Sequence, residues 1–348
     1  KFKVKGFELK GITFDSRRVE KNDIFLALKG KQVDGHEFID DALNNGASIV
    51  FSEKESKDSR VIYKESTKDV LRILASNYRR ESNCKIIAIT GSNGKTTTKE
   101  ILYHTIRNEI SCIRNIRNYN STLGMPMSTF QIMKDTDYCI LEMGTNEKGE
   151  IKYLCDIAKP DIGLLTNISE THLENFHTVN NITIEKSYLF NSLSSDGTAF
   201  INNDDINIVK GAKRTKAKKI SFGFNMQSDY FATSTYDNNI ININNQSICV
   251  PYNNKAFINN ALPAFSIANY LGISADKFQY YLTTFSMPTG RFNIINSRNF
   301  VIIDDCYNAN YASTISGIDS LLSINRDSNS ERKIIIVFGD MLELGEKE

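Results

Sequence analysis

The residues best suited to chemistry lie between Lys85 and Lys99, where the sequence reads KIIAITGSNGKTTTK. The apolar run Lys85–Thr90 predicts a β-strand, and Thr96–Asn108 predicts a helix directly after a glycine turn. Glycines let backbone N–H groups close around an anion, and a helix N-terminus adds the positive end of its dipole. Lys95 is expected to reach the β- and γ-phosphates of a nucleotide, and the Thr96 hydroxyl is expected to hold Mg2+. The predicted phosphate-binding residues are Gly91, Ser92, Asn93, Gly94, Lys95, Thr96 and Thr97.

One position departs from the general phosphate-loop pattern GxxxxGK[ST], because Ile89 stands where the first glycine is expected. The alternative to a phosphate loop is a helix-capping turn that carries a surface lysine. The order of strand, glycine turn and Gly-Lys-Thr favours the binding of nucleotide phosphates.

Three later segments place polar side chains near the expected ends of strands in the same sheet. They contain Glu142 in LEMG, His172 in TNISETHLE and Lys186 in IEKS. A Mg2+ that bridges phosphates prefers hard oxygen ligands, which makes Glu142 a candidate ligand. His172 could bind a second metal or orient a substrate. Taken singly, the three residues have structural alternatives, namely an exposed strand end, a helix cap and a solvated helix face.

The elements that must position these residues alternate between strands and helices from Lys85 onward. This alternation predicts an α/β fold with a parallel sheet that binds ligands at the carboxyl ends of its strands. Glu142, Thr166 and Asn167 all lie at such ends. Between Ala199 and Pro251 the pattern changes to β-type stretches, with hairpin turns expected at 238–239 and 244–245.

Two polar or turn-forming segments divide the chain. Glu81-Ser82-Asn83 precedes the phosphate-loop strand, and Met287-Pro288-Thr289-Gly290 follows the last central helix. We therefore expect three domains, at residues 1–83, 84–286 and 287–348. In the third, the predicted strands Phe300–Asp304 and Lys333–Phe338 flank a helix at Ser313–Ile324, which makes one βαβ unit.

Composition narrows the class of protein. A formal net charge of +1 over 348 residues gives no reason to expect nucleic acid or a membrane surface as a partner. No apolar run approaches the roughly 20 residues that span a bilayer, and the N-terminus lacks the apolar region of a signal peptide. The six cysteines are scattered, which favours reduced thiols in the cytoplasm over a disulfide frame or a structural zinc site. The chain lacks an initial Met and stops soon after a predicted strand, so we expect it to be incomplete.

Together these segments resemble the Mur ligases, the ATP-dependent amino-acid-adding enzymes of peptidoglycan synthesis. The family's phosphate loop commonly reads TGxxGKT, as Thr90–Thr96 does, and this accounts for the missing glycine. The resemblance implies that Lys186 is carbamylated, which would convert its ammonium into a carboxylate-like ligand for a second Mg2+. It implies metal ligands at Thr96, Glu142, His172 and Lys186, and catalytic roles for Lys95, His172 and Lys186.

Within the family, the chain looks most like the members that add D-alanyl-D-alanine. Asp304–Asn310 (DDCYNAN) is similar to their DDSYNAN signature, and Gly339–Gly345 (GDMLELG) is similar to GDMxELG. Sister ligases and folylpolyglutamate synthases carry other residues at these places. The resemblance implies further nucleotide contacts from Asn260, Arg291 and Asp305, although Asp305 could equally cap a strand. It implies substrate contacts from Ser16, Arg17, Asp34, Gly35, His36, Asn118, Asn120, Ser121, Asn308 and Asn310.

The implied architecture has a small α/β N-terminal domain that binds a UDP-sugar, a central ATP-binding domain and a partial Rossmann-like C-terminal domain. The implied reaction uses ATP and Mg2+, at two sites, to convert the carboxylate of a UDP-MurNAc-tripeptide into an acyl phosphate. The amine of D-Ala-D-Ala then attacks it. We expect a monomer that acts on small molecules in the cytoplasm. The alternatives are a sister Mur ligase, a folylpolyglutamate-synthase-like ligase, or a nucleotide-binding remnant without turnover.

Several positions depart from the family's pattern. Ala256-Phe257 replaces a His-Asn pair, which leaves Asn260 as the asparagine on the adenine side. Cys306 replaces a serine, Tyr311 a proline and Ser121 an asparagine. The third domain is expected to lack about a hundred residues of a complete one.

Overall fold

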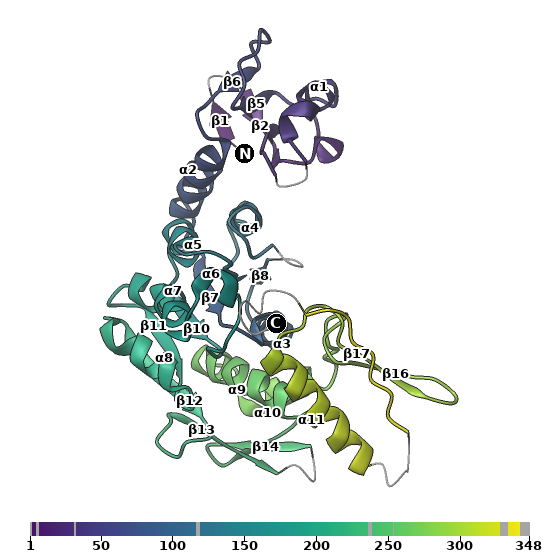
Figure 1. Ribbon diagram of the computed structural model, residues 1–348. Coiled ribbons are helices and arrows are strands. Elements are labelled where there is room, and N and C mark those ends of the chain that lie inside the picture. The colour runs from purple at the N-terminus through teal and green to yellow at the C-terminus, as the bar shows by residue number, and fades with distance from the viewer. Residues whose placement is uncertain are drawn as a thin grey trace.

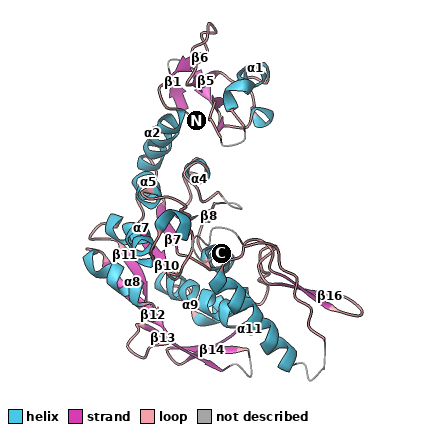
Figure 2. Cartoon of the chain, viewed as in Figure 1, coloured by secondary structure: helices cyan, strands magenta, loops and turns pink. Residues whose placement is uncertain are grey.

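The computed structural model describes residues 2–4, 7–30, 33–115, 119–235, 239–252, 254–327 and 333–341. Figure 1 shows a small N-terminal sheet at one end of the molecule, joined through helix α2 (Thr67–Arg80) to a larger central sheet. Figure 2 shows the mixture of helices and strands along the whole chain, as expected for an α/β protein. Among the described residues, every helix is too short or too polar to cross a bilayer.

The N-terminal part is built on a four-stranded parallel sheet in the order β3-β4-β5-β6. A separate antiparallel pair, β1 (Phe2–Val4) and β2 (Phe7–Leu9), precedes it. The sheet packs Phe25 and Val50 against α1, and Leu26 and Leu71 lie in the core on its other face. Its elements are β3 (Ile12–Thr13), β4 (Ile24–Leu26), α1 (Ile39–Asn44), β5 (Ile49–Ser52) and β6 (Val61–Tyr63).

The central sheet has nine strands in the order β15-β14-β13-β12-β11-β10-β7-β9-β8. The seven from β8 to β13 run parallel, and β14 and β15 add an antiparallel hairpin at one edge. The strands are β7 (Lys85–Thr90), β8 (Cys112–Arg114), β9 (Tyr138–Glu142), β10 (Ile162–Leu165), β11 (Thr198–Asn202), β12 (Lys218–Gly223), β13 (Tyr230–Thr235), β14 (Ile240–Ile243) and β15 (Gln246–Cys249).

Helices cover both faces of this sheet, so its middle strands are buried and almost wholly apolar, as is usual for parallel strands. One face packs against α3 (Lys95–Ile106), α9 (Lys255–Tyr270) and α10 (Ala275–Leu282). The other packs mainly against α5, α7 and α8. The helices on this side are α4 (Gly124–Thr129), α5 (Glu150–Ala158), α6 (Leu173–Phe176), α7 (Val179–Ser192) and α8 (Ile206–Gly211).

The hairpin turn expected at Asn244-Asn245 is confirmed, because both residues adopt positive φ, 48° and 66°, between β14 and β15. That conformation suits asparagine and matches the twist of the paired strands. The expected turn at Asn238-Asn239 has Asn239 at φ 51°, while residue 238 lies outside the described residues.

The third segment differs from the βαβ unit that the sequence predicts. Strand β17 (Val301–Asp304) pairs antiparallel with β16 (Asn293–Asn296), and α11 (Tyr311–Asp327) follows. The expected strand Lys333–Phe338 is wrong. Those residues form no strand in the described part of the chain, and the side chains of Ile335 and Val337 are 75% and 90% exposed. An apolar run becomes a strand only where a neighbouring strand pairs with its backbone, and here no described strand lies alongside it.

Candidate functional site

The phosphate loop joins the carboxyl end of β7 to the first turn of α3. Gly91 and Gly94 adopt φ values of 148° and 82°, a region that side chains disfavour. The Lys95 ammonium turns back onto this loop and donates to the carbonyl oxygens of Gly91 at 2.8 Å and Ser92 at 3.0 Å. The predicted order of strand, glycine turn and helix is confirmed.

Gly94 is required for a second reason, since Asn260 of α9 lies directly behind it. A Cβ atom on Gly94 would come within 2.1 Å of Asn260 Oδ1. That oxygen accepts a hydrogen bond from the Thr98 hydroxyl at 3.2 Å, so Asn260 joins α9 to the helix that begins at the loop.

The segment after β10 holds the other side of the loop. The Thr166 hydroxyl and the Asn167 amide donate to the Asn93 carbonyl oxygen at 2.6 and 2.9 Å. In return, the Asn93 backbone N–H donates to Asn167 Oδ1 at 3.0 Å. These contacts hold the loop in one conformation, which reduces the conformational entropy that would be lost when a ligand binds.

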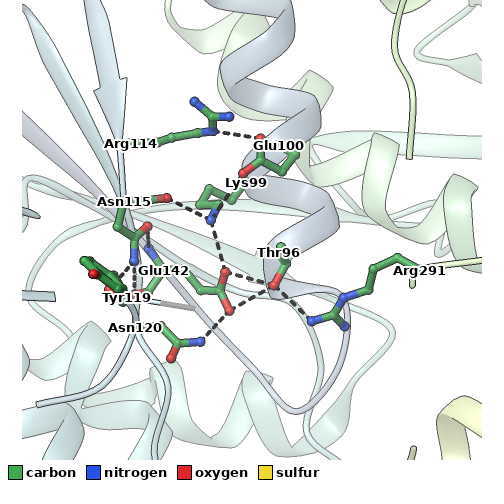
Figure 3. Close-up of polar contacts among 9 residues, drawn as sticks. All are labelled: Thr96, Lys99, Glu100, Arg114, Asn115, Tyr119, Asn120, Glu142 and Arg291. Atoms are coloured by element: carbon green, nitrogen blue, oxygen red, sulfur yellow. Dashed lines mark hydrogen bonds and ion pairs between the residues drawn. The ribbon is translucent and has the colours of Figure 1, made fainter. Parts of the chain in front are cut away.

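Glu142, at the end of β9, lies against the first turn of α3 (Figure 3). The Thr96 hydroxyl lies 2.9 and 3.1 Å from its two carboxylate oxygens. Asn120 donates to Oε1 at 2.8 Å, and the Lys99 ammonium lies 3.4 Å from Oε2. Burial by itself would raise the pKa of Glu142, but Lys99 and Lys95, with the bonds from Asn120 and Thr96, outweigh it and hold the pKa below its usual value.

This donor set suits Mg2+. Thr96 and Glu142 present hard oxygen atoms next to a loop shaped for phosphates, and Mg2+ commonly takes one or two protein oxygens together with phosphate oxygens and water. Among the described residues, no three His, Cys, Asp or Glu side chains gather into a metal-binding group. The pair therefore fits a metal that is shared with a nucleotide.

The other two predicted metal ligands are placed differently. His172 is the N-cap residue directly before α6, with φ 53°, and lines the same cavity as Thr96 and Glu142. Lys186, on α7, is 2% exposed and donates to the Gly91 carbonyl oxygen at 3.2 Å, but it is not among the residues that line the cavity. Burial and the nearby Lys95 cation lower the pKa of Lys186 well below its usual value, although Glu185 opposes them.

The third segment reaches the loop through two side chains. Arg291 donates to the Thr96 hydroxyl at 3.2 Å, and its guanidinium lies 4.1 Å from the centroid of the Tyr307 ring. The Asn310 amide donates to Asn93 Oδ1 at 2.6 Å. Asp305 accepts the backbone N–H of Phe292 at 3.0 Å, so it does cap the neighbouring backbone as well as line the cavity.

These elements surround one cavity of about 1000 Å3, large enough for more than one small ligand. Predicted residues on its wall are Ser92, Asn93, Gly94, Lys95, Thr96, Thr97, Asn120, Ser121, Glu142, His172, Asn260, Arg291, Asp305, Asn308 and Asn310. Asp340 and Met341 of the second predicted signature also line it, whereas residues 342–345 of that signature lie outside the described part of the chain.

Six predicted substrate residues are not on this wall. Asn118 lies outside the described residues. The other five belong to the N-terminal part, where Arg17 pairs with Asp15 at 2.8 Å and Asp34 accepts the backbone N–H of His36 at 3.0 Å. These five are Ser16, Arg17, Asp34, Gly35 and His36. Their contact with a substrate stays a prediction.

Sequence reasoning missed two polar residues at the site. Lys99 and Asn115 contact Glu142, one through the carboxylate and the other through the backbone. Lys99 stands three residues after Thr96, a spacing that places both on one face of α3, and this was the signal available. Asn115 gave no comparable signal, because only the pairing of β8 with β9 brings it to Glu142.

Family models match three stretches of the chain. Residues 89–274 match the Mur ligase middle domain, residues 8–89 match the model described as Mur ligase family, catalytic domain, and residues 290–348 match the Mur ligase glutamate ligase domain.

Individual relatives agree with these models. The chain is 32% identical to a UDP-N-acetylmuramoyl-tripeptide--D-alanyl-D-alanine ligase of Rickettsia prowazekii, over 96% of this chain and 76% of that protein. Among solved structures, MurF from Acinetobacter baumannii superposes with a TM-score of 0.88 at 30% identity, over 99% of this chain and 76% of that one. MurF ligase from Thermotoga maritima in complex with ADP gives 0.85 at 29% identity, over 99% and 80%.

Proposed function

Because the chain belongs to the Mur ligase family, we propose that it is an ATP-dependent ligase that joins D-alanyl-D-alanine to a UDP-N-acetylmuramoyl-tripeptide. The observation that carries this function is one cavity, in which Lys95, Thr96 and Glu142 lie together with Arg291 and with Asn310, the last residue of the DDCYNAN segment. That segment is similar to the DDSYNAN signature of the ligases that add D-alanyl-D-alanine.

The chemistry requires activation, because a carboxylate does not react with an amine at neutral pH. Transfer of the γ-phosphoryl group of ATP to the tripeptide carboxylate gives an acyl phosphate and ADP. The amine of the dipeptide attacks this carbonyl, and the tetrahedral intermediate collapses to the amide and phosphate. Phosphoryl transfer depends mainly on positioning and positive charge.

We assign roles to the residues of the cavity accordingly. Lys95 and the backbone N–H groups of 91–97 bind the β- and γ-phosphates. Arg291 adds positive charge from the third segment, and Asn260 and Asp305 contact the nucleoside. Asn120, Ser121, Asn308 and Asn310 hold the peptide and the incoming amine, and the N-terminal residues around Asp34 hold the uridine nucleotide.

Thr96 and Glu142 would hold Mg2+, which supplies positive charge next to the transferring phosphoryl group. Their adjacency supports this role, and so does the lowered pKa of Glu142, which keeps the carboxylate ionised.

A second metal site would use His172 and a carbamylated Lys186. Burial that lowers the pKa of the Lys186 amine supports this modification, since carbamylation by CO2 needs the unprotonated amine. Native mass spectrometry is expected to show the added carbamate. K186A is expected to lose activity and to regain part of it with short carboxylic acids, and a fully active K186A would contradict the assignment.

We propose domain boundaries after residues 83 and 286, with the three parts serving the uridine nucleotide, ATP and the incoming amine. The free thiols of all six cysteines and the use of ATP favour a cytoplasmic enzyme, and we propose that it acts as a monomer.

The test is a phosphate-release assay with each component left out in turn. Release is expected only when ATP, Mg2+, the UDP-linked tripeptide and D-Ala-D-Ala are all present, and K95A is expected to abolish it. Release that is indifferent to the dipeptide would contradict the function. Turnover with a single amino acid in place of the dipeptide would indicate a sister ligase, and ATP binding without turnover would indicate a remnant.

A further inference from the structure

Lys99 is a lysine with no exposed side-chain surface, in the second turn of α3. A buried ammonium is costly unless hydrogen bonds and opposite charges compensate it. The phosphate loop itself does not use this residue, because Lys95 is the cation that contacts the loop carbonyls. The presence of a second, fully buried lysine one turn away therefore needs an explanation.

Three acceptors surround the Lys99 ammonium. It donates to the Asn115 carbonyl oxygen at 3.0 Å, and it lies 3.3 Å from Glu100 Oε1 and 3.4 Å from Glu142 Oε2. Glu100 is shared with Arg114, whose Nε lies 2.7 Å from Glu100 Oε2. Glu142, by contrast, has no cation as close as Lys99 in the described part of the chain.

Lys99 contacts the carboxylate of Glu142, and its partner Asn115 contacts the Glu142 backbone (Figure 3). Asn115 Oδ1 accepts the Glu142 backbone N–H at 2.9 Å, and Asn115 Nδ2 donates to the Glu142 carbonyl oxygen at 3.0 Å. Lys99 binds the Asn115 carbonyl and faces the Glu142 carboxylate. One side chain thus links the strand end, the loop after β8 and the helix that carries Thr96.

We infer that Lys99 is a positioning residue for Mg2+ binding, which holds the Glu142 carboxylate against Thr96 on the side of the phosphate loop. This inference rests on the proposed function, because it takes Thr96 and Glu142 as the metal-binding pair. Partners that orient a metal ligand typically change metal affinity by about 10- to 100-fold when they are removed.

The alternative is that Lys99 only stabilises the packing of α3 against the sheet. The two roles differ in what a neutral replacement changes. A positioning residue affects binding of the metal more than binding of the metal-free nucleotide, whereas a packing residue affects folding or both kinds of binding equally.

The experiment uses the whole chain and two probes. Mn2+ binding is measured by electron paramagnetic resonance in the presence of a non-hydrolysable ATP analogue. Binding of the analogue without metal is measured by calorimetry in EDTA. K99M removes the charge and keeps the length of the side chain, and E100Q is the matched control, since it alters the other carboxylate beside Lys99 and leaves Glu142 untouched.

K99M is expected to weaken Mn2+ binding by about tenfold or more and to change metal-free binding less than about threefold. E100Q is expected to stay near the wild type in both. Unchanged Mn2+ affinity in K99M, or equal losses with and without metal, would overturn the inference. If K99M does not fold, K99Q tests the same point with a donor retained for the Asn115 carbonyl. A wild-type chain that binds neither probe would refute the proposed function itself.

Discussion

Both ring nitrogens of His36, a predicted substrate-binding residue, have hydrogen-bond partners within the protein. Its Nδ1 lies 2.5 Å from Asp34 Oδ1, and its Nε2 accepts the backbone N–H of Glu53 at 2.9 Å. Since Nε2 is an acceptor, the proton of the neutral ring sits on Nδ1 and is donated to Asp34. This pair holds the loop between β4 and α1 in place. Asp34 is the more exposed residue of the two, and its carboxylate also pairs with Lys54.

Asp34 should therefore make stability depend on pH. The backbone N–H and the ring of His36, with Lys54, lower the pKa of Asp34 below its usual 3.8. A lowered pKa in the folded state adds stability above the unfolded pKa, and this stability is lost as pH falls below it. The difference in unfolding free energy between the wild type and D34N is expected to be constant from pH 7 to about 5 and to shrink below about pH 4.

Urea titrations at several pH values measure this difference. D41N, which alters an exposed carboxylate on α1, supplies the background slope to subtract. A difference that grows as the pH falls would contradict the assignment.

Among single residues, the sequence predicted those whose contacts are with residues close by in the chain. Gly91, Gly94, Lys95 and Thr96 follow from one continuous loop. Their tertiary partners did not follow, because the Asn310–Asn93 bond joins residues 217 positions apart.

Glu185 is a buried carboxylate of α7 that caps a different helix. Its two oxygens accept the backbone N–H groups of Gly149 at 2.7 Å and Ile151 at 2.8 Å, at the start of α5. This negative charge lies at the positive end of the α5 dipole, where it is favourable. Glu185 therefore connects α7 to α5, which lie on the same face of the sheet.

E185A is expected to reduce the free energy of unfolding by about 2 to 3 kcal/mol, because it leaves the buried N–H of Ile151 and the part-buried N–H of Gly149 without their charged acceptor. E150A is the matched control. Glu150 also accepts two backbone N–H groups, from Asn146 and Glu147, but it does so at exposed positions. Its loss should be about 1 kcal/mol or less. Denaturant unfolding of both variants checks this, and equal losses would argue against burial as the cause.

The sequence predicted strands with long apolar runs where a neighbouring strand pairs with them. It could not predict whether such a neighbour would be present. The runs at β7, β9 and β10 predicted strands of a parallel sheet, and each of them pairs with a parallel strand on both sides. The run Lys333–Phe338 is equally apolar but has no described neighbour to pair with. A run of apolar residues specifies the tendency to extend, while pairing decides whether a strand forms.

On the scale of the whole molecule, Arg79 of α2 joins the N-terminal part to the central sheet. Its guanidinium donates to the carbonyl oxygen of Ala158 at 2.8 Å and to that of Ser82 at 3.1 Å, and it lies 3.3 Å from Asp161 Oδ2. Asp161 also accepts the backbone N–H of Ile86, the second residue of β7. The N-terminal helix is thereby connected to the strand that leads into the phosphate loop.

R79M is expected to destabilise the chain by about 2 to 3 kcal/mol, since it leaves the buried carbonyl of Ala158 and the part-buried carbonyl of Ser82 without this donor and removes the ion pair with Asp161. It should also separate the unfolding of the N-terminal part from that of the central sheet, which differential scanning calorimetry detects as a second transition. R80M, at the exposed neighbouring position, is the control. A single transition at the wild-type temperature in R79M would refute this coupling.

The motifs predicted a division into three parts, which stays a prediction, and they did not predict the contacts between those parts. Arg79 carried no signal in the sequence, because its acceptors are mostly backbone oxygens, which every residue possesses.

The bonds from Arg291 to Thr96 and from Asn310 to Asn93 bear on the timing of turnover. A segment that covers the loop on which ATP binds must move aside to admit ATP and again to release ADP. Such opening often limits the rate of well-adapted enzymes. We therefore expect kcat to fall as sucrose raises the viscosity of the solvent. A kcat that does not change with viscosity would instead indicate that the chemical step limits the rate.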